Sequence, residues 1–216
     1  MSAHSGPVCA VAMARDGSVA ASASYDHTVA LLRDGAVVHR ASFDANIEGV
    51  VFLPTTSGAP ETLVAAPRES PALSLIDVAS GTVTSYNMNP LGDAWADYSV
   101  LDLAVPCHDE SFLVMATTDK SKSLLFDVRT PGGPVRHMRG PANNGYALPA
   151  SVFTQRYFAV TSQDRSIYAF DLGTGEQMAV LGAHEHTIRD LAWDASAGCL
   201  ASGGYDKVVR TWSAPV

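Results

Sequence analysis

Four side chains near the end of the sequence have types that can hydrogen-bond to one another in series. They are His184, Ser202, Asp206 and Trp212. An indole N–H only donates, a hydroxyl donates and accepts, a neutral imidazole does both through its two nitrogens, and a carboxylate accepts. Groups linked in that order satisfy one another, so a buried polar network adds rigidity instead of costing free energy. The chemistry that these residues favour is therefore structural.

Other combinations could in principle bind a metal or act as nucleophiles. His184 and His186 alternate in a segment that reads as extended, where two such side chains can converge on a metal. No third ligand lies within reach in the sequence, and His184 already has a place in the polar set. Cys107 and His108 are adjacent but isolated from further catalytic or ligating residues. We therefore expect no metal site and no cofactor.

Two carboxylates, Asp102 and Asp190, occupy equivalent positions in two strand-like segments. A pair of carboxyl groups facing each other could carry glycoside hydrolysis. The alternative is that each carboxylate caps nearby backbone groups. There is no glycine-rich phosphate loop and no further catalytic constellation. We expect no enzymatic activity. The alternative, a hydrolase, would require these two carboxylates to lie within a few ångströms of each other.

The elements that position these residues repeat along the chain. Units of about 40 to 45 residues are typical of propeller blades. The third strand of each unit is expected to end at an apolar residue, and these endpoints lie 44, 50, 44 and 42 residues apart: Leu32, Ile76, Phe126, Phe170 and Trp212. Asp16-Gly17 and Asp34-Gly35 suit tight hairpin turns, which need residues that tolerate positive φ. No segment has a convincing helical period.

The last unit, from Gly182 to Trp212, resembles the WD-repeat family in the spacing of its His, Ser, Asp and Trp. The resemblance implies that these four residues form a hydrogen-bonded network inside one blade. The first unit matches with His4, Ser22 and Asp26, but Leu32 replaces the tryptophan. The fourth unit keeps Asp164, and the second and third have lost nearly all of the polar signature. Replacing all partners by apolar residues leaves no orphaned polar group, so the fold tolerates this loss.

The predicted fold class is all-β, a WD-repeat β-propeller of about five blades within a single domain over 1–216. The repeats cover about 4–41, 43–86, 96–138, 144–181 and 184–216. Propellers have four to eight blades, so five units are either a small closed ring or an incomplete arc. Pro215 cannot donate to a strand ladder, so the last blade is expected to lack its outer strand. An open arc would expose strand edges that a partner or a second copy could complete. The alternative is that the chain is a fragment of a longer propeller.

Proteins of this family usually bind partners on the face that carries the turns between second and third strands. The expected rim residues are Tyr25, His27, Gln163, Arg165, Tyr205 and Lys207. Tyr25 and Tyr205 would be neighbours if the ring closes. Tyrosine is favoured at binding hot spots, and the alternative is that each ring packs over its own turn. This rim predicts a noncatalytic scaffold for protein–protein interaction in a multiprotein assembly.

A second functional reading comes from Phe126-Asp127-Val128-Arg129 at the end of a third strand. It resembles the box with which many WD-repeat proteins dock on the adaptor of cullin-4 ubiquitin ligases, where Asp127 and Arg129 would be the docking residues. The alternative is that Arg129 only forms a local ion pair with the carboxylate of Asp127 at the end of the strand.

Composition limits the partners. The formal net charge of −8 argues against bulk attraction to nucleic acid or anionic membrane, and no apolar run is long enough to span a membrane. A local cluster around Arg129, Arg136, His137 and Arg139 could instead contact an acidic partner or RNA. Three widely spaced cysteines and no recognisable signal peptide favour an intracellular location, cytoplasmic or nuclear. The expected partners are proteins whose identity the sequence does not reveal.

Overall fold

The computed structural model describes residues 2–54, 61–90, 92, 99–106, 112–130, 132–143, 149–154, 156–182 and 184–213. These residues form β-strands joined by turns, grouped in five antiparallel sheets that each use strands consecutive in the sequence. The first sheet contains β1 (Val8–Met13), β2 (Ala20–Ser24), β3 (Thr28–Arg33) and β4 (Ala36–Ser42). The second contains β5 (Ile47–Phe52), β6 (Thr62–Pro67), β7 (Ala72–Asp77) and β8 (Val83–Asn87). The third contains β9 (Val100–Ala104), β10 (Leu113–Thr118), β11 (Lys122–Asp127) and β12 (Arg136–Arg139). The fourth contains β13 (Ser151–Phe153), β14 (Tyr157–Thr161), β15 (Ser166–Asp171) and β16 (Gln177–Gly182). The fifth contains β17 (Ile188–Asp194), β18 (Cys199–Gly204) and β19 (Val209–Ser213).

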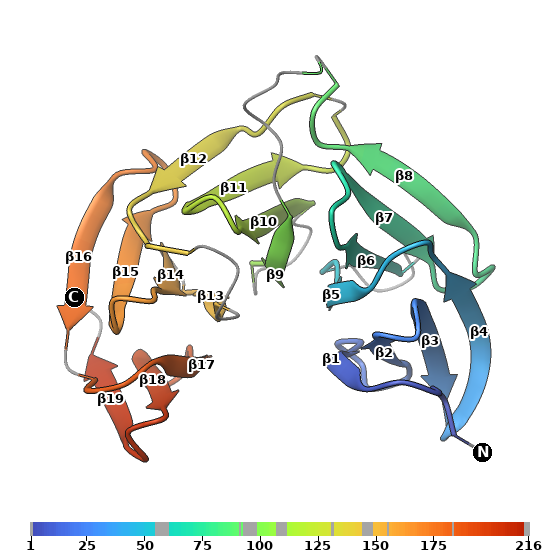
Figure 1. The fold of residues 1–216 in the computed structure, drawn as a ribbon, viewed down its shortest axis with the longest axis horizontal. Helices are drawn as coiled ribbons and strands as arrows, with labels where there is room; N and C mark the ends of the chain where they lie inside the picture. Colours follow the sequence, from blue (N-terminus) through green and yellow to red (C-terminus); the bar gives the residue numbers. More distant parts are fainter. Residues whose placement is uncertain are drawn as a thin grey trace.

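The five sheets, called blades 1 to 5 in sequence order, stand around a common centre as the blades of a propeller (Figure 1). The first strand of each blade is innermost. This arrangement confirms the predicted all-β propeller of about five blades. The described residues include no helix that could cross a membrane.

Equivalent residues occupy equivalent registers in the five blades. Each predicted third-strand endpoint pairs with a residue of the second strand: Leu32 with Ala20, Ile76 with Leu63, Phe126 with Val114, Phe170 with Phe158, and Trp212 with Leu200. Gly35 follows Asp34 in the turn between β3 and β4, with φ of 76° and 51°. Two successive residues at positive φ match the twist that a tight hairpin requires.

The hydrophobic core is divided into four clusters, and each cluster is shared by two consecutive blades. Ile47 and Leu31 belong to the cluster between blades 1 and 2, and Phe126 to that between blades 2 and 3. Phe158 packs between blades 3 and 4, and Ile188 between blades 4 and 5. Each blade is therefore held by its neighbours along the chain.

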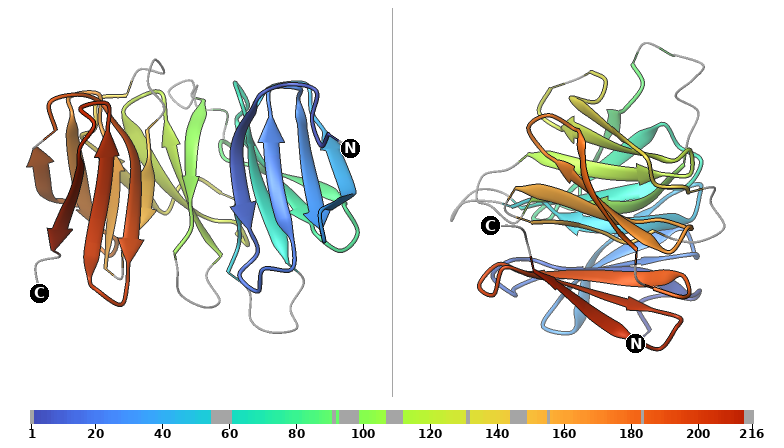
Figure 2. Two further views of the ribbon diagram at one scale, coloured as in Figure 1. Left: turned by 90° about the horizontal axis from the view of Figure 1, so that it is seen from below. Right: turned by 90° about the vertical axis from the view of Figure 1, so that its left-hand side faces the viewer.

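The arc is open within the described residues. Inner strands contact one another in the order β1, β5, β9, β13 and β17, but β17 does not pack on β1. Blades 1 and 5 stand on opposite sides of an opening, which is visible in Figure 1 and in the left-hand view of Figure 2. Blade 5 consists of three strands among the described residues, whereas the other four blades have four. Of the two predicted alternatives, a closed ring or an open arc, the described residues form the open arc.

Candidate functional site

The polar residues of blade 5 are brought together as a continuous network. The indole Nε1–H of Trp212 donates to Ser202 Oγ at 2.9 Å, and Ser202 Oγ lies 2.8 Å from His184 Nε2. His184 Nδ1 lies 2.8 Å from Asp206 Oδ2. A single arrangement of protons satisfies every group, with the serine hydroxyl donating to Nε2 and Nδ1–H donating to the carboxylate. The imidazole is fully buried.

Asp206 also holds the backbone of the turn that follows. Its carboxylate accepts from the N–H groups of Glu185 at 3.2 Å and Val208 at 3.2 Å. Burial alone would raise the pKa of Asp206, but hydrogen bonds from His184 and these backbone groups outweigh it, so the pKa is lowered. The network therefore fixes the turn between β18 and β19, which carries Tyr205 and Lys207.

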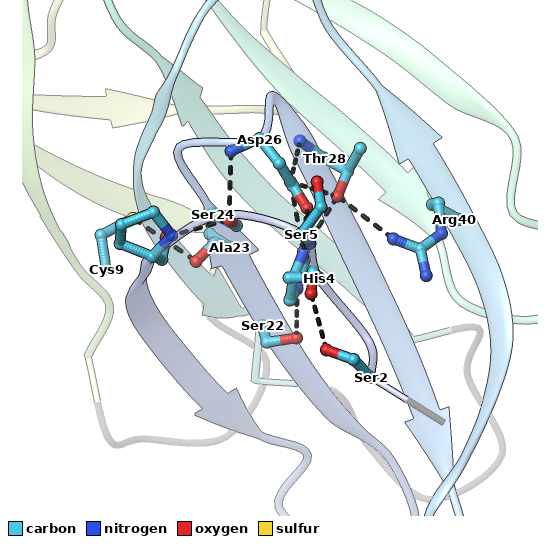
Figure 3. Close-up of polar contacts among 11 residues, drawn as sticks. Ser2, His4, Ser5, Cys9, Ser22, Ala23, Ser24, Asp26, Thr28 and Arg40 are labelled. Atoms are coloured by element: carbon cyan, nitrogen blue, oxygen red, sulfur yellow. Dashed lines mark hydrogen bonds and ion pairs between the residues drawn. The ribbon is translucent and has the colours of Figure 1, made fainter.

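Blade 1 has a shorter version of the same network (Figure 3). His4 Nε2 lies 2.8 Å from Ser22 Oγ, and His4 Nδ1 lies 3.2 Å from both carboxylate oxygens of Asp26. Thr28 adds a hydroxyl that donates to Asp26 at 2.6 Å. Ser5 donates its N–H to Asp26 at 2.8 Å. Since Leu32 has no donor, the series ends at the serine hydroxyl.

The turns between second and third strands share one backbone feature. One residue in each turn has positive φ although it is not glycine: His27, Glu69, Ser121, Arg165 and Lys207, with φ between 56° and 72°. This conformation is uncommon for residues with a Cβ. Because it recurs in every blade, the five turns project side chains from one face of the arc in a repeated geometry. We call these turn residues, with Tyr25, Gln163 and Tyr205, the rim.

Tyr205 is the most exposed aromatic residue of the rim, with 65% of its surface accessible. The guanidinium of Arg189, from the innermost strand β17, lies 5.6 Å from the centre of its ring. A cation over an aromatic face restricts the ring while leaving the other face open. Tyr205 thus packs against Arg189 of its own blade, and most of its side chain stays exposed.

Tyr25 is held differently. Its hydroxyl donates to Glu48 Oε2 at 3.4 Å, a carboxylate of the neighbouring blade. Glu48 is buried and forms an ion pair with Arg68 at 2.9 Å. Burial of the phenol and the nearby Glu48 charge raise the pKa of Tyr25. Tyr25 is therefore a contact between blades 1 and 2, with a modest exposed face.

Gln163 and Arg165 of blade 4 bind neighbouring segments of the chain. The N–H of Gln163 donates to Ala142 O at 3.0 Å, and Arg165 Nη1 donates to Glu185 O at 3.1 Å. His27 and Lys207 occupy the positive-φ positions of their turns and are exposed. Because the arc is open, Tyr25 and Tyr205 flank the opening and are not neighbours in a closed ring.

Two contributors to the rim, Glu48 and Arg189, were not expected from the sequence. Both sit at a β-bulge in the innermost strand, where the register shifts between Ile47 and Gly49 and between Ile188 and Asp190. A bulge re-aims the extra residue. Alignment of the repeats places Cys9 at the same bulge in blade 1. Comparing this position across the repeats is the sequence signal that could have identified Glu48 and Arg189.

The second sequence-derived candidate is a local ion pair at the end of β11. Arg129 donates through Nε to Asp127 Oδ1 at 3.0 Å and through Nη2 to Oδ2 at 2.6 Å. Its guanidinium also lies 4.8 Å from the centre of the Phe112 ring. Phe126 is fully buried in the core. In this structure the two polar side chains satisfy each other.

The two carboxylates considered for glycoside hydrolysis, Asp102 and Asp190, differ in their surroundings. Ser151 Oγ donates to Asp102 Oδ2 at 2.6 Å, across from blade 4 to blade 3. Burial raises the pKa of Asp102 to about 7 despite this hydrogen bond, and the charge of Asp190 adds to the rise. Asp190 Oδ1 accepts from the N–H of Leu191 at 2.9 Å. Asp102 therefore has a structural partner, and backbone capping is present at Asp190.

The part of the chain that the structure describes contains no group of three or more His, Cys, Asp or Glu side chains that could hold a metal ion. His184 is committed to the network of blade 5. Cys107 and His108 lie outside the described residues.

Comparisons with known proteins agree with this geometry. The family model described as "WD domain, G-beta repeat" matches residues 1–31 and 175–213, the two units with the polar networks. A LEC14B homolog from Prunus armeniaca is 36% identical over 70 residues, which are 32% of this chain and 15% of that protein. The LEC14B protein from Lithospermum erythrorhizon is 34% identical over 67 residues, 31% of this chain and 14% of that protein.

A solved structure extends the likeness to the whole arc. The crystal structure of the WD40 beta propeller domain of Doa1 superposes with a TM-score of 0.77 at 17% identity. The match covers 99% of this chain and 66% of the Doa1 chain. The similarity in sequence is thus concentrated in the end units, and the similarity in fold includes the degenerate units between them.

Proposed function

Because the chain is a WD-repeat β-propeller, a fold that generally mediates protein–protein interactions and is generally noncatalytic, we propose that it is an interaction scaffold. Its rim presents side chains to folded domains or peptides within a multiprotein assembly. One observation carries this proposal: the turns of all five blades share a strained backbone conformation, and in four of them the residue in that conformation is exposed on one face of the arc (His27, Glu69, Arg165 and Lys207). Strained positions persist when the surrounding structure holds them, and they gather at binding sites.

Tyr205 is the strongest anchor of the proposed surface. It combines large exposure with a fixed position, because Arg189 restricts the ring and the buried network restricts the backbone. Rigid aromatic side chains bury a large area at a small entropy cost, which favours them at hot spots. The proposed partners are proteins, and an intracellular location is part of the proposal.

Docking on the adaptor of cullin-4 ligases is the less favoured alternative. The aromatic residue of that box, Phe126, lies in the core and offers no surface to a partner. Asp127 and Arg129 are engaged with each other. The rim has exposed groups of both kinds, aromatic and charged, and therefore suits a partner better.

Affinity purification from native cells, quantified by mass spectrometry, tests the rim. The variant Tyr205→Ala combined with Lys207→Gly removes two rim side chains, and glycine suits the positive φ at residue 207. Val83→Ala, on the outer strand β8, is the matched control because Val83 is exposed away from the rim. We expect the rim variant to lose at least tenfold in recovery of specific partners while the control retains them. Equal recovery by both variants, with unchanged melting temperatures, would show that partners bind elsewhere.

A further inference from the structure

The rim carries side chains of opposite charge in different blades. Two of its positions recur along the chain: the bulge residue of the innermost strand and the positive-φ residue of the turn between second and third strands. In blade 2 both positions are acidic, with Glu48 and Glu69, whereas in blade 5 both are basic, with Arg189 and Lys207. Arg165 holds the positive-φ position of the adjacent blade 4 (Figure 1). Basic side chains therefore gather where blades 4 and 5 meet.

The backbone at these positions does not require a basic side chain. Cys9 occupies the bulge of blade 1, and His27 and Ser121 occupy the positive-φ positions of blades 1 and 3. Apart from glycine, the residues enriched at positive φ are asparagine, aspartate and histidine. Turn geometry therefore explains neither Arg165 nor Lys207, and a role on the surface is left for their charges.

Charges at equivalent bulges are neutralised in blade 2 but not in blade 5. The Glu48 side chain is fully buried and forms an ion pair with Arg68 at 2.9 Å. Arg189 is exposed, and its guanidinium lies 5.6 Å from the centre of the Tyr205 ring. An aromatic face attracts the cation but carries no formal charge. The guanidinium of Arg189 therefore keeps its capacity to bind an anion.

Arg165 is also held by a neutral group. Its Nη1 donates to Glu185 O at 3.1 Å and so reaches from blade 4 to the segment that leads into blade 5. A guanidinium has five N–H donors, and this contact uses one Nη atom. Among the described residues, the three basic side chains of this surface form no ion pair, whereas Arg156 pairs with Asp171. Arg165 is thus fixed in place while its charge stays unneutralised.

Two carboxylates of the same surface are already engaged. Asp206 binds His184 and two backbone N–H groups. Asp164 accepts from the hydroxyl of Tyr168 at 2.7 Å and from a backbone N–H at 3.0 Å. The side chain of Glu185 is exposed, so the surface is mixed in charge. A partner must therefore place its carboxylates beside the arginines, not merely approach a positive field.

We propose that this surface, which we call the basic rim (Arg165, Arg189, Lys207 and Tyr205), binds an acidic segment of a partner polypeptide. The inference rests on the proposed function and names the chemistry of the partner. Carboxylates of the segment accept paired N–H groups from Arg165 and Arg189. An apolar side chain of the segment packs on Tyr205, which is 65% exposed. The net charge of −8 opposes a long polyanion such as RNA, so a short acidic segment is favoured.

A short fluorescent peptide of glutamates around a central phenylalanine is the probe, and its control has glutamine in place of every glutamate. Fluorescence anisotropy with the full chain measures both at low and at high salt. We expect the acidic peptide to bind about tenfold more tightly than the control, and the difference to shrink as salt screens the charges. Equal binding of the two peptides, or binding of neither, would overturn the proposal.

The double variant Arg165→Gln with Arg189→Gln removes two charges of the basic rim. Its matched control is Arg136→Gln with Arg139→Gln on β12, where both arginines are exposed and Arg136 is likewise held by a carbonyl, Gly173 O at 3.0 Å. We expect the rim double variant to weaken the acidic peptide about tenfold, because charged hydrogen bonds are lost, and the control to bind as wild type. Equal losses in both would show general electrostatics and overturn the site.

Charge reversal separates recognition from a change in folding. Arg165→Glu with Arg189→Glu is expected to reject the acidic peptide and to bind a peptide with lysine in place of every glutamate. The same reversal at Arg136 and Arg139 is expected to leave acidic binding intact. Failure of the first variant to exchange its preference would contradict direct contact. A single-stranded RNA that binds wild type more tightly than the acidic peptide, and is lost with Arg165→Gln and Arg189→Gln, would overturn the assignment to a polypeptide.

Purification from native cells distinguishes this inference from the function on which it rests. We expect partners that Tyr205→Ala with Lys207→Gly loses to be lost also by Arg165→Gln with Arg189→Gln. If the arginine variant keeps these partners, the acidic segment is wrong and the scaffold remains supported. If the tyrosine variant itself keeps all partners, the rim as a binding face is wrong, and the inference is overturned with it.

Discussion

Individual polar residues stabilise this propeller where they complete one another. Ser202 is the junction of the blade 5 network, since it meets both Trp212 and His184. Its counterpart Ser22 meets His4 alone, because Leu32 stands where the indole would be. Removing a junction leaves more buried groups without a partner than removing an end of the series. The two networks therefore differ in their sensitivity to substitution.

The first prediction follows from that difference. Ser202→Ala leaves Trp212 Nε1–H and His184 Nε2 without their partner, so we expect it to lower the free energy of unfolding by about 2–3 kcal/mol. Trp212→Phe removes only one donor and most of the apolar contact remains, so we expect a loss of about 1 kcal/mol from the hydrogen bond. Urea denaturation followed by circular dichroism measures both. A smaller loss for Ser202→Ala than for Trp212→Phe would contradict the serine's role as junction.

The second prediction concerns Asp102, whose pKa burial raises to about 7. A carboxyl group with a raised pKa binds its proton more tightly in the folded than in the unfolded state. Its contribution to stability is therefore greatest below about pH 4 and is lost as the pH rises toward 7. Asp102→Asn keeps an acceptor for Ser151 and carries no charge. We expect this variant to be more stable than wild type at pH 8, by about 2 kcal/mol once partial exposure is allowed for.

Unfolding of both proteins across pH 4 to 8 measures this effect. The stability difference should grow with pH, and the two proteins should converge near pH 4. Asp26 and Asp206 shift in the opposite direction, because hydrogen bonds lower their pKa values. Their contribution is present at neutral pH and is lost in acid, in wild type and variant alike. A difference between the two proteins that is constant with pH would show that the pKa of Asp102 is the same in the folded and unfolded states.

At the scale of single strands and turns, much of the architecture could be predicted from local pattern. The apolar endpoints of the third strands recur because each must reach the core shared with the next blade, and they occupy one register from Leu32 to Trp212. The rim positions followed from the same alignment. Hairpin turns were indicated by Asp-Gly pairs, which tolerate the backbone conformation that they adopt.

What could not be predicted depends on contacts between blades or on irregular strands. Glu48 and Arg189 read as ordinary strand residues, and only the bulge in β5 and β17 turns them toward the rim. The hydrogen bond from Ser151 to Asp102 joins residues 49 apart in the sequence. A single sequence carries no signal for such tertiary contacts.

On the scale of the whole molecule, the decisive feature is that five blades share four core clusters. The blade faces that flank the opening carry residues whose counterparts are core elsewhere. Val209 is 75% exposed, whereas the residues three before the other strand endpoints, Val29, Leu73, Ser123 and Ile167, are at most 1% exposed. On the other flank, Val11 is 74% exposed, while its counterpart Val50 is buried. Interior surfaces are thus presented to solvent on both sides of the opening.

The last prediction tests whether the arc is open in solution, with the same substitution at equivalent positions of two blades. Val29→Ala removes methyl groups from a packed core, so we expect it to lower the free energy of unfolding by about 2 kcal/mol. Val209→Ala removes the same groups from an exposed surface, where changes usually stay within about 0.5 kcal/mol. Urea denaturation at low micromolar concentration compares the two variants with wild type. If Val209→Ala costs as much as Val29→Ala, the Val209 face is covered in solution, and the opening is closed by rearrangement or association. If the loss of stability in Val209→Ala is small but grows with protein concentration, the two flanks are sites of self-association. In such a complex Val209 would be buried, and removing its methyl groups would destabilise the protein as it does in a core.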